Sequence, residues 1–236
     1  MRQAERIKAA RLCGRVIVAT TGEREDDVIA EICRTENLDC YRGDPRDLLD
    51  RHYRAALQFG GGTVIKIPSD CPLIDPRVVD KVIAYWLEHT GEFDFVSNLH
   101  PATWPDGNDV EIMTFEALEQ AWRVADRSME REHTTPFIWE RPERFRIGNV
   151  TMGGGADYSM THRFTIDYAA DYQFIRAVFE ELYPADPLFG VGEILALLEE
   201  RPDLYAINAD LAGVNWYRHH LDELKTVGAR QTKHTL

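Results

Sequence analysis

Short apolar runs and amphipathic stretches alternate along the first hundred residues of the chain. Each run has the length of a buried strand, and each stretch between two runs has the spacing of apolar positions that is typical of a helix. The expected strands are residues 16–20, 39–42, 63–67 and 93–97. Strands that alternate with helices predict a mostly parallel sheet, flanked by helices and joined by right-handed crossovers. The pattern therefore predicts an α/β fold.

The pattern becomes less regular after Asn98. Residues 99–109 have the composition of a loop. Further strands are expected at residues 110–113, 145–150 and 163–168, and further helices at residues 114–124, 131–139, 169–183, 191–199 and from Asn215 onward. No internal repeat or long linker divides the chain. We therefore expect a single domain over residues 1–236, with residues 99–160 as its less regular region.

Two aspartates follow apolar strands that lie about a hundred residues apart in the chain. Asp70 comes after the strand at 63–67, just before the helix start at Asp75 and Pro76, and Asp167 ends the strand near Arg163. Ligands of open α/β sheets bind beyond the carboxyl ends of the strands. If the two strands are neighbours, both carboxylates face one crevice, which suits Mg²⁺. The alternatives are that Asp70 only stabilises a turn and that Asp167 caps the next helix.

The composition narrows the class of ligand. The chain has 27 Lys and Arg against 40 Asp and Glu, a formal net charge of −13. This balance argues against a surface for nucleic acid, which needs basic patches. No apolar run approaches the length of a membrane span, and no signal peptide is present. The four cysteines lack the spacing of metal ligands, so we expect reduced thiols in a cytoplasmic protein.

Seven segments, in this order, carry a resemblance to a known family. They are Val16-Ile-Val-Ala-Thr-Thr21, Tyr41-Arg42-Gly43, Leu49-Asp50-Arg51, Ser69-Asp70-Cys71-Pro72-Leu73-Ile74-Asp75, Pro105-Asp106-Gly107-Asn108-Asp109-Val110-Glu111, Arg131-Glu132-His133-Thr-Thr-Pro136-Phe-Ile138 and Phe164-Thr-Ile-Asp167. The chain resembles the CMP-sugar cytidylyltransferases, of the type that activates 3-deoxy-octulosonate and sialic acids. It is most similar to their spore coat polysaccharide branch.

The resemblance implies a Rossmann-like nucleotide-diphospho-sugar transferase fold and a reaction. In that reaction a hydroxyl of an acidic sugar attacks the α-phosphate of CTP, pyrophosphate leaves, and the product serves a cell-surface polysaccharide. The implied residues are Asp70 and Asp167 as catalytic ligands of Mg²⁺, Thr20, Thr21, Arg42 and Arg51 on the CTP side, and Asp106, Asp109, Glu111, His133 and Arg163 on the acceptor side, with Arg131 and Glu132 nearby. Each has a simpler alternative, a solvated or locally paired charge. Lys66, within an apolar strand, either reaches a ligand or extends to solvent.

The chain departs from the family at its beginning. The family opens with a central strand and a basic, glycine-rich loop that holds the triphosphate, whereas residues 1–12 match only the end of the following helix. We therefore expect the first central strand to be missing between residues 16–20 and 63–67. The gap should be an apolar slot with unpaired backbone groups. We also expect the missing strand and loop to be encoded upstream of Met1.

Two further classes of function are compatible with the pattern. One is a truncated, non-catalytic family member that binds a sugar or a partner. The other is a glycosyltransferase that uses a nucleotide sugar, although Asp70 is followed by Cys71 rather than by the usual second acid. Family members commonly pair, so we expect a homodimer. Its apolar face would come from the aromatic residues of 99–158, unless they complete the core; these are Trp104, Trp122, Phe137 and Trp139.

Overall fold

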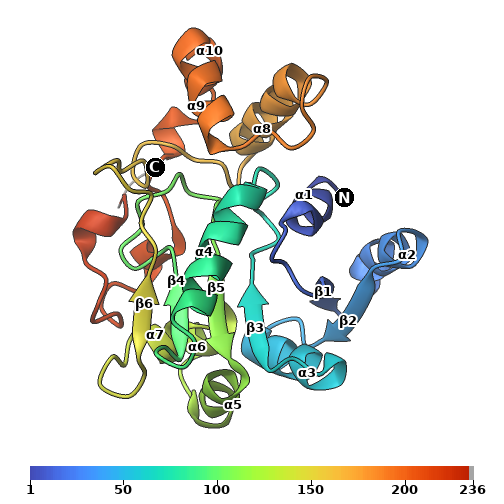
Figure 1. Ribbon diagram of the computed structural model, residues 1–236, viewed down its shortest axis with the longest axis vertical. Coiled ribbons are helices and arrows are strands. Elements are labelled where there is room, and N and C mark those ends of the chain that lie inside the picture. Colours follow the sequence, from blue (N-terminus) through green and yellow to red (C-terminus); the bar gives the residue numbers. More distant parts are fainter. Residues whose placement is uncertain (234–236) are drawn as a thin grey trace.

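The strands form two sheets that stand side by side (Figure 1). The computed structural model describes residues 1–233. In the smaller sheet β1 (Ile17–Thr21) runs parallel to β2 (Asp39–Gly43). The larger sheet has the order β3-β5-β4-β6, with bounds β3 (Thr63–Lys66), β4 (Phe95–Ser97), β5 (Glu111–Thr114) and β6 (Ile147–Asn149). Because β5 is antiparallel to both β3 and β4, the other three strands share one direction.

Helices cover the sheets and connect the strands. Their bounds are α1 (Arg2–Ala9), α2 (Asp27–Thr35), α3 (Leu48–Phe59), α4 (Pro76–Glu88), α5 (Phe115–Val124), α6 (Ser128–His133), α7 (Pro136–Trp139), α8 (Ala169–Leu182), α9 (Val191–Glu200) and α10 (Pro202–Tyr205), with 3₁₀ turns η1 (Arg24–Asp26), η2 (Ala209–Leu211), η3 (Trp216–His219) and η4 (Ala229–Gln231). Local signals set several ends: the Asp75 carboxylate accepts from Arg77 N at the start of α4 (2.8 Å), and Gly60 closes α3 with a φ of 76°. Among the described residues, no helix is long and apolar enough to cross a membrane.

A slot separates the two sheets, at the place where the sequence predicts a gap between residues 16–20 and 63–67. One edge of β1 and one edge of β3 carry no partner strand among the described residues, and both line the same cavity. Ile7 of α1 and Ala55 and Ala56 of α3 also line it. Strands inside a parallel sheet are normally buried on both faces. Here β1 and β3 are mostly half-buried because their open edges face the slot.

Three expected elements differ from the structure. The helix expected from Asn215 onward is only the short 3₁₀ turn η3, for which the Asn215 side chain accepts from Tyr217 N. The helix expected at residues 131–139 is two short helices, because Thr134 between them has a φ of 73°. The strand expected at residues 163–168 is an extended segment that runs beside the turn after β3. Its Ile166 N donates to Asp70 O (2.9 Å), so these backbone groups pair with a loop rather than with a sheet.

The aromatic residues considered for a dimer face pack mainly inward. Phe137 and Trp139 are buried in the core cluster that fills the space between β4, β5 and α3, and Trp122 packs against that cluster. The alternative that these aromatics complete the core is therefore the correct one for these three residues. Only Trp104 lies outside that cluster, and its Nε1 donates to Val150 O (3.2 Å).

Candidate active site

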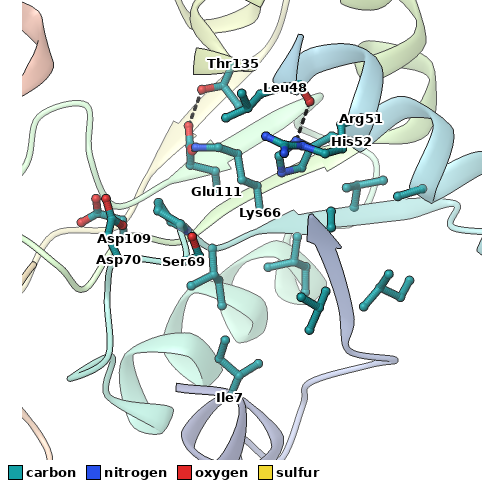
Figure 2. A pocket seen from close by; sticks show the side chains of 18 of the residues that line it. Ile7, Leu48, Arg51, His52, Lys66, Ser69, Asp70, Asp109, Glu111 and Thr135 are labelled. Carbon is teal, nitrogen blue, oxygen red and sulfur yellow. Dashed lines mark hydrogen bonds and ion pairs between the residues drawn. The ribbon is translucent and has the colours of Figure 1, made fainter. Parts of the chain in front are cut away.

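The slot widens into a cavity of about 770 Å³ at the carboxyl ends of the strands. Its lining includes Arg51 and the expected acidic and histidine residues of both substrate sides: Asp70, Asp106, Asp109, Glu111, Asp167, Glu132 and His133. Figure 2 shows the Asp70 and Asp109 carboxylates at one end and Arg51 with His52 toward the other, with Lys66 and Glu111 between. Residues from distant parts of the chain therefore meet in one cavity.

Three of the aspartates hold protons more tightly than usual. Burial raises the pKa of Asp70, and the neighbouring Asp167 raises it further. Burial also raises the pKa of Asp106 to about 7, although Arg163 opposes the shift. The pKa of Asp109 is raised well above its ordinary value by burial and by the charges of Asp106 and Asp70. A cation in the cavity would stabilise the ionised carboxylates.

Arg163 lies behind the cavity wall rather than in it. Its side chain is buried, and its guanidinium donates to Asp171 (3.0 Å), to Asp106 (3.2 Å) and to Asp167. It holds two of the cavity carboxylates in place, and its own side chain does not line the cavity. Asp171 accepts from the backbone N–H groups of Asp167 and Tyr168 (both 3.0 Å) and so caps α8. The Asp167 carboxylate therefore has no capping role.

A buried ion pair crosses the floor of the cavity. Lys66 of β3 pairs with Glu111 of β5, whose side chain is 2% exposed. The Glu111 carboxylate also accepts from the Thr135 hydroxyl (2.5 Å), and that hydroxyl accepts from Trp139 Nε1 (3.2 Å). Glu111 raises the pKa of Lys66 against the opposing effect of burial. Lys66 thus stays charged beside the carboxylates and does not extend to solvent.

Only one of the four residues expected on the CTP side reaches the cavity. Arg51 lines it, is 8% exposed, and has an Nε–H without a hydrogen-bond partner among residues 1–233. The hydroxyls of Thr20 and Thr21 instead donate to Asp26 (2.8 and 2.6 Å).

Arg42 is also occupied away from the cavity. It donates to Thr21 O (2.9 Å), to Glu23 O (2.7 Å) and to Asp27 (2.7 Å). These contacts hold the turn after β1 in place. Thr20, Thr21 and Arg42 are not among the residues that line the cavity.

His133 lines the cavity and stacks on Trp216, with ring centroids 3.8 Å apart. Burial lowers its pKa to about 4, so the ring is neutral at pH 7. Arg131 instead pairs with Asp47 at the start of α3. Several other lining residues belong to no motif in the sequence and were not expected in the site. They come from a loop, a helix and the C-terminal segment: His52, His100, Asn215, Trp216 and Tyr217.

The residues present fit a magnesium ion at Asp70 and Asp167. Both carboxylates line the cavity, and the charge of one raises the pKa of the other. Among the described residues, no group of three or more His, Cys, Asp or Glu side chains is arranged to hold a metal. Mg²⁺ commonly takes one or two protein carboxylates and completes its shell with water and phosphate oxygens. Two carboxylates in a wide cavity match this kind of coordination.

Comparison with known proteins decides the family. A family model described as Cytidylyltransferase matches residues 2–203. The chain belongs to the cytidylyltransferase family. This cytidylyltransferase is 32% identical over 211 residues to an uncharacterised protein of Methanocaldococcus jannaschii, covering 88% of the chain and 82% of that protein. It is 23% identical over 189 residues to the spore coat polysaccharide biosynthesis protein SpsF of Bacillus subtilis, covering 80% and 76%.

Solved structures confirm the fold of the cytidylyltransferase. A cytidylyltransferase from Leptospira borgpetersenii superposes with a TM-score of 0.80 at 28% identity, covering 86% of this chain and 84% of that one. The CMP:2-keto-3-deoxy-manno-octonic acid synthetase, solved in complex with CTP, superposes with a TM-score of 0.53 at 13% identity, covering 76% and 86%. The predicted family and the predicted Rossmann-like nucleotidyltransferase fold are therefore confirmed.

Proposed function

We propose that this cytidylyltransferase transfers CMP from CTP to a hydroxyl of an acidic sugar, with release of pyrophosphate. The observation that carries the proposal is the convergence of Asp70 and Asp167 on one cavity in a chain of this family. The similarity to a spore coat polysaccharide protein supports a role in building a cell-surface glycan. The structure of a synthetase with bound CTP, on the same fold, supports CTP as the donor.

Different side chains of the cavity would have different roles in the reaction. Mg²⁺ at Asp70 and Asp167 would offset the phosphate charge and hold the phosphate oxygens. Arg51 offers an unpaired N–H to an anionic part of the nucleotide. Asp109 and Glu111 can accept hydrogen bonds from sugar hydroxyls. With a pKa of about 7, Asp106 has the proton affinity that a base needs to take the proton of the attacking hydroxyl near neutral pH.

A homodimer is also part of the proposal. Family resemblance supports it, whereas most of the aromatic residues first considered for the interface lie in the core. Light scattering on the purified chain measures the oligomeric state directly. A mass of one protomer at micromolar concentration would contradict the dimer.

The reaction is tested by pyrophosphate release. The full chain is incubated with CTP, Mg²⁺ and a panel of 3-deoxy-octulosonic and nonulosonic acids. We expect release with at least one sugar, and a loss of kcat/KM of about 100-fold or more in Asp70→Asn because metal and phosphate positioning fail. Asp222→Asn, which neutralises an exposed carboxylate elsewhere, is the matched control. A folded chain that releases no pyrophosphate with any sugar would contradict the proposal.

A further inference from the structure

The C-terminal segment builds one wall of the cavity. Asn215, Trp216 and Tyr217 line it, although the match to the family ends at residue 203. The segment, which follows α10 and is coloured red in Figure 1, is tied to the rest of the chain at both sides of these residues. Arg163 donates to Val214 O (2.6 Å), and the backbone N–H groups of Lys225 and Thr226 donate to Glu140 (2.6 and 2.8 Å).

Arg163 couples this wall to the carboxylates. The same guanidinium that contacts Val214 O also contacts Asp106 and Asp167. A buried group with several fixed partners holds them in one geometry. The position of the C-terminal wall is therefore set by the residue that positions the acids of the site.

The wall presents aromatic rings to the acid-rich end of the cavity. Trp216 stacks on His133 (centroids 3.8 Å apart, interplanar angle 14°), and Tyr217 packs edge-on against Trp216 (4.6 Å). His100 and Trp139 form a second stacked pair within reach of the Tyr217 ring (6.3 and 6.2 Å). Among residues 1–233, none forms a hydrogen bond with the Tyr217 hydroxyl.

Tyr217 lies close to the acceptor-side acids. After burial, the charges of Glu111, Asp109 and Asp106 are the largest causes of its raised pKa. The rings and the carboxylates therefore border one space. Aromatic faces cover the C–H surface of a sugar ring, while carboxylates and a phenol bind its hydroxyls. Arg51 lies toward the other end of the cavity, so this chemistry belongs to the acceptor rather than to the nucleotide (Figure 2).

We propose that Trp216 and Tyr217 are the residues that select the acceptor sugar. Trp216 covers an apolar face of the sugar ring, and the Tyr217 hydroxyl bonds a ring substituent opposite Asp109 and Glu111. The inference rests on the proposed function for its kinetic test. The inference goes beyond the proposed function, because Trp216 and Tyr217 lie outside the part of the chain that matches the family.

The kinetic test separates the acceptor from CTP. With the sugar that supports pyrophosphate release, Trp216→Ala is expected to raise the KM for the sugar about tenfold or more and to change the KM for CTP less than about twofold. Trp216→Phe, which keeps an aromatic ring, should recover most of the loss. Tyr217→Phe should raise the sugar KM several-fold. Tyr172→Phe, which removes the hydroxyl of an exposed residue on α8, is the control.

Two kinetic results would overturn the inference. One is an unchanged sugar KM in Trp216→Ala and Tyr217→Phe. The other is a parallel rise in the KM for CTP, which would place the nucleotide base on this wall. Either result leaves the proposed function intact, because turnover itself is still observed.

A binding experiment keeps the inference testable if no sugar is turned over. Saturation-transfer NMR on the full chain with the same sugar panel detects ring protons close to the protein. Signals in the wild type that disappear in Trp216→Ala and return in Trp216→Phe support the sugar wall even though the proposed function has failed. Equal signals in wild type and Trp216→Ala, or no signal with any sugar, overturn the inference.

Discussion

At the scale of single residues, the cavity shows how burial and neighbouring charges change one kind of side chain. Asp70, Asp106 and Asp109 are all aspartates, and each has a raised pKa because water is excluded and at least one other carboxylate lies nearby. Asp171, which is also buried, has a lowered pKa because Arg163 and Asn208 donate to it. The number of donors facing a carboxylate, and not burial alone, decides its charge.

These shifts make stability depend on pH in a direction that can be worked out. A carboxyl with a higher pKa in the folded chain binds more protons there than in the unfolded chain. Its contribution to the free energy of unfolding is therefore present below its ordinary pKa and is lost as the pH rises through its raised, folded value. We expect Asp109→Asn to raise the free energy of unfolding by about 1–2 kcal/mol at pH 8 and to change it little at pH 4.

The measurement is urea unfolding of the wild type and the variant at pH 4 and pH 8. Comparing each variant with the wild type at the same pH cancels the opposite effect of the buried histidines, whose lowered pKa values favour the folded state at higher pH. Asp222→Asn, on the surface, should show no such difference between the two pH values. An equal effect of Asp109→Asn at both values would mean that Asp109 is not perturbed.

At the scale of elements, close contact with the segment at 163–167 shapes the loop that carries Asp106 and Asp109. Gly107 has a φ of 100°, and a Cβ there would lie 2.6 Å from the backbone carbon of Phe164. The contact brings Asp106 beside Arg163, and an isolated parallel β-bridge pairs these two residues. A glycine is therefore needed for both conformation and space.

Gly107→Ala is expected to destabilise the fold by about 2 kcal/mol or more, since it adds a clash to an unfavourable φ. Gly153→Ala is the matched control, because Gly153 has a φ of 93° but no atom within 4 Å of its Cβ position. That variant should cost only about 1 kcal/mol of backbone strain. Thermal or urea unfolding of both variants measures the difference. Equal losses would show that the close contact with Phe164 carries no energy.

The ends of helices were predicted best, because they depend on residues that are close in the sequence. Asp75 caps α4, Thr114 caps α5 by accepting from Ala117 N (3.1 Å), and Gly60 ends α3. Each of these depends on a few neighbouring residues, so the sequence contains all the information needed. The placement of Asp70 in the cavity lining follows in the same way, because it stands in the turn after β3.

Features that depend on distant partners were predicted less well. The segment at 163–167 has the apolar pattern of a strand, but its backbone bonds to the Asp70 turn. Trp216 and Tyr217 reach the cavity through a C-terminal segment that Arg163 and Glu140 anchor. No local motif encodes such long-range contacts.

At the scale of the whole molecule, the slot between the sheets is the feature that organises the rest. It continues into the cavity, so the open edges of β1 and β3 and the acidic site belong to one space. In contrast, β5 and β4 are paired on both sides. The centre of the larger sheet should therefore resist opening, whereas the two slot edges should not, because their outward N–H groups lack partner strands.

Amide hydrogen exchange, followed by NMR, tests this contrast. In each of β1 and β3, the amides that point toward the slot should exchange at least about tenfold faster than those of β5 under native conditions. The amides of β1 that point toward β2 are the internal control, since they belong to the same strand but have partners. Uniform protection across β1 and β3 would contradict the prediction, because it requires a hydrogen-bond partner for both edges of the slot.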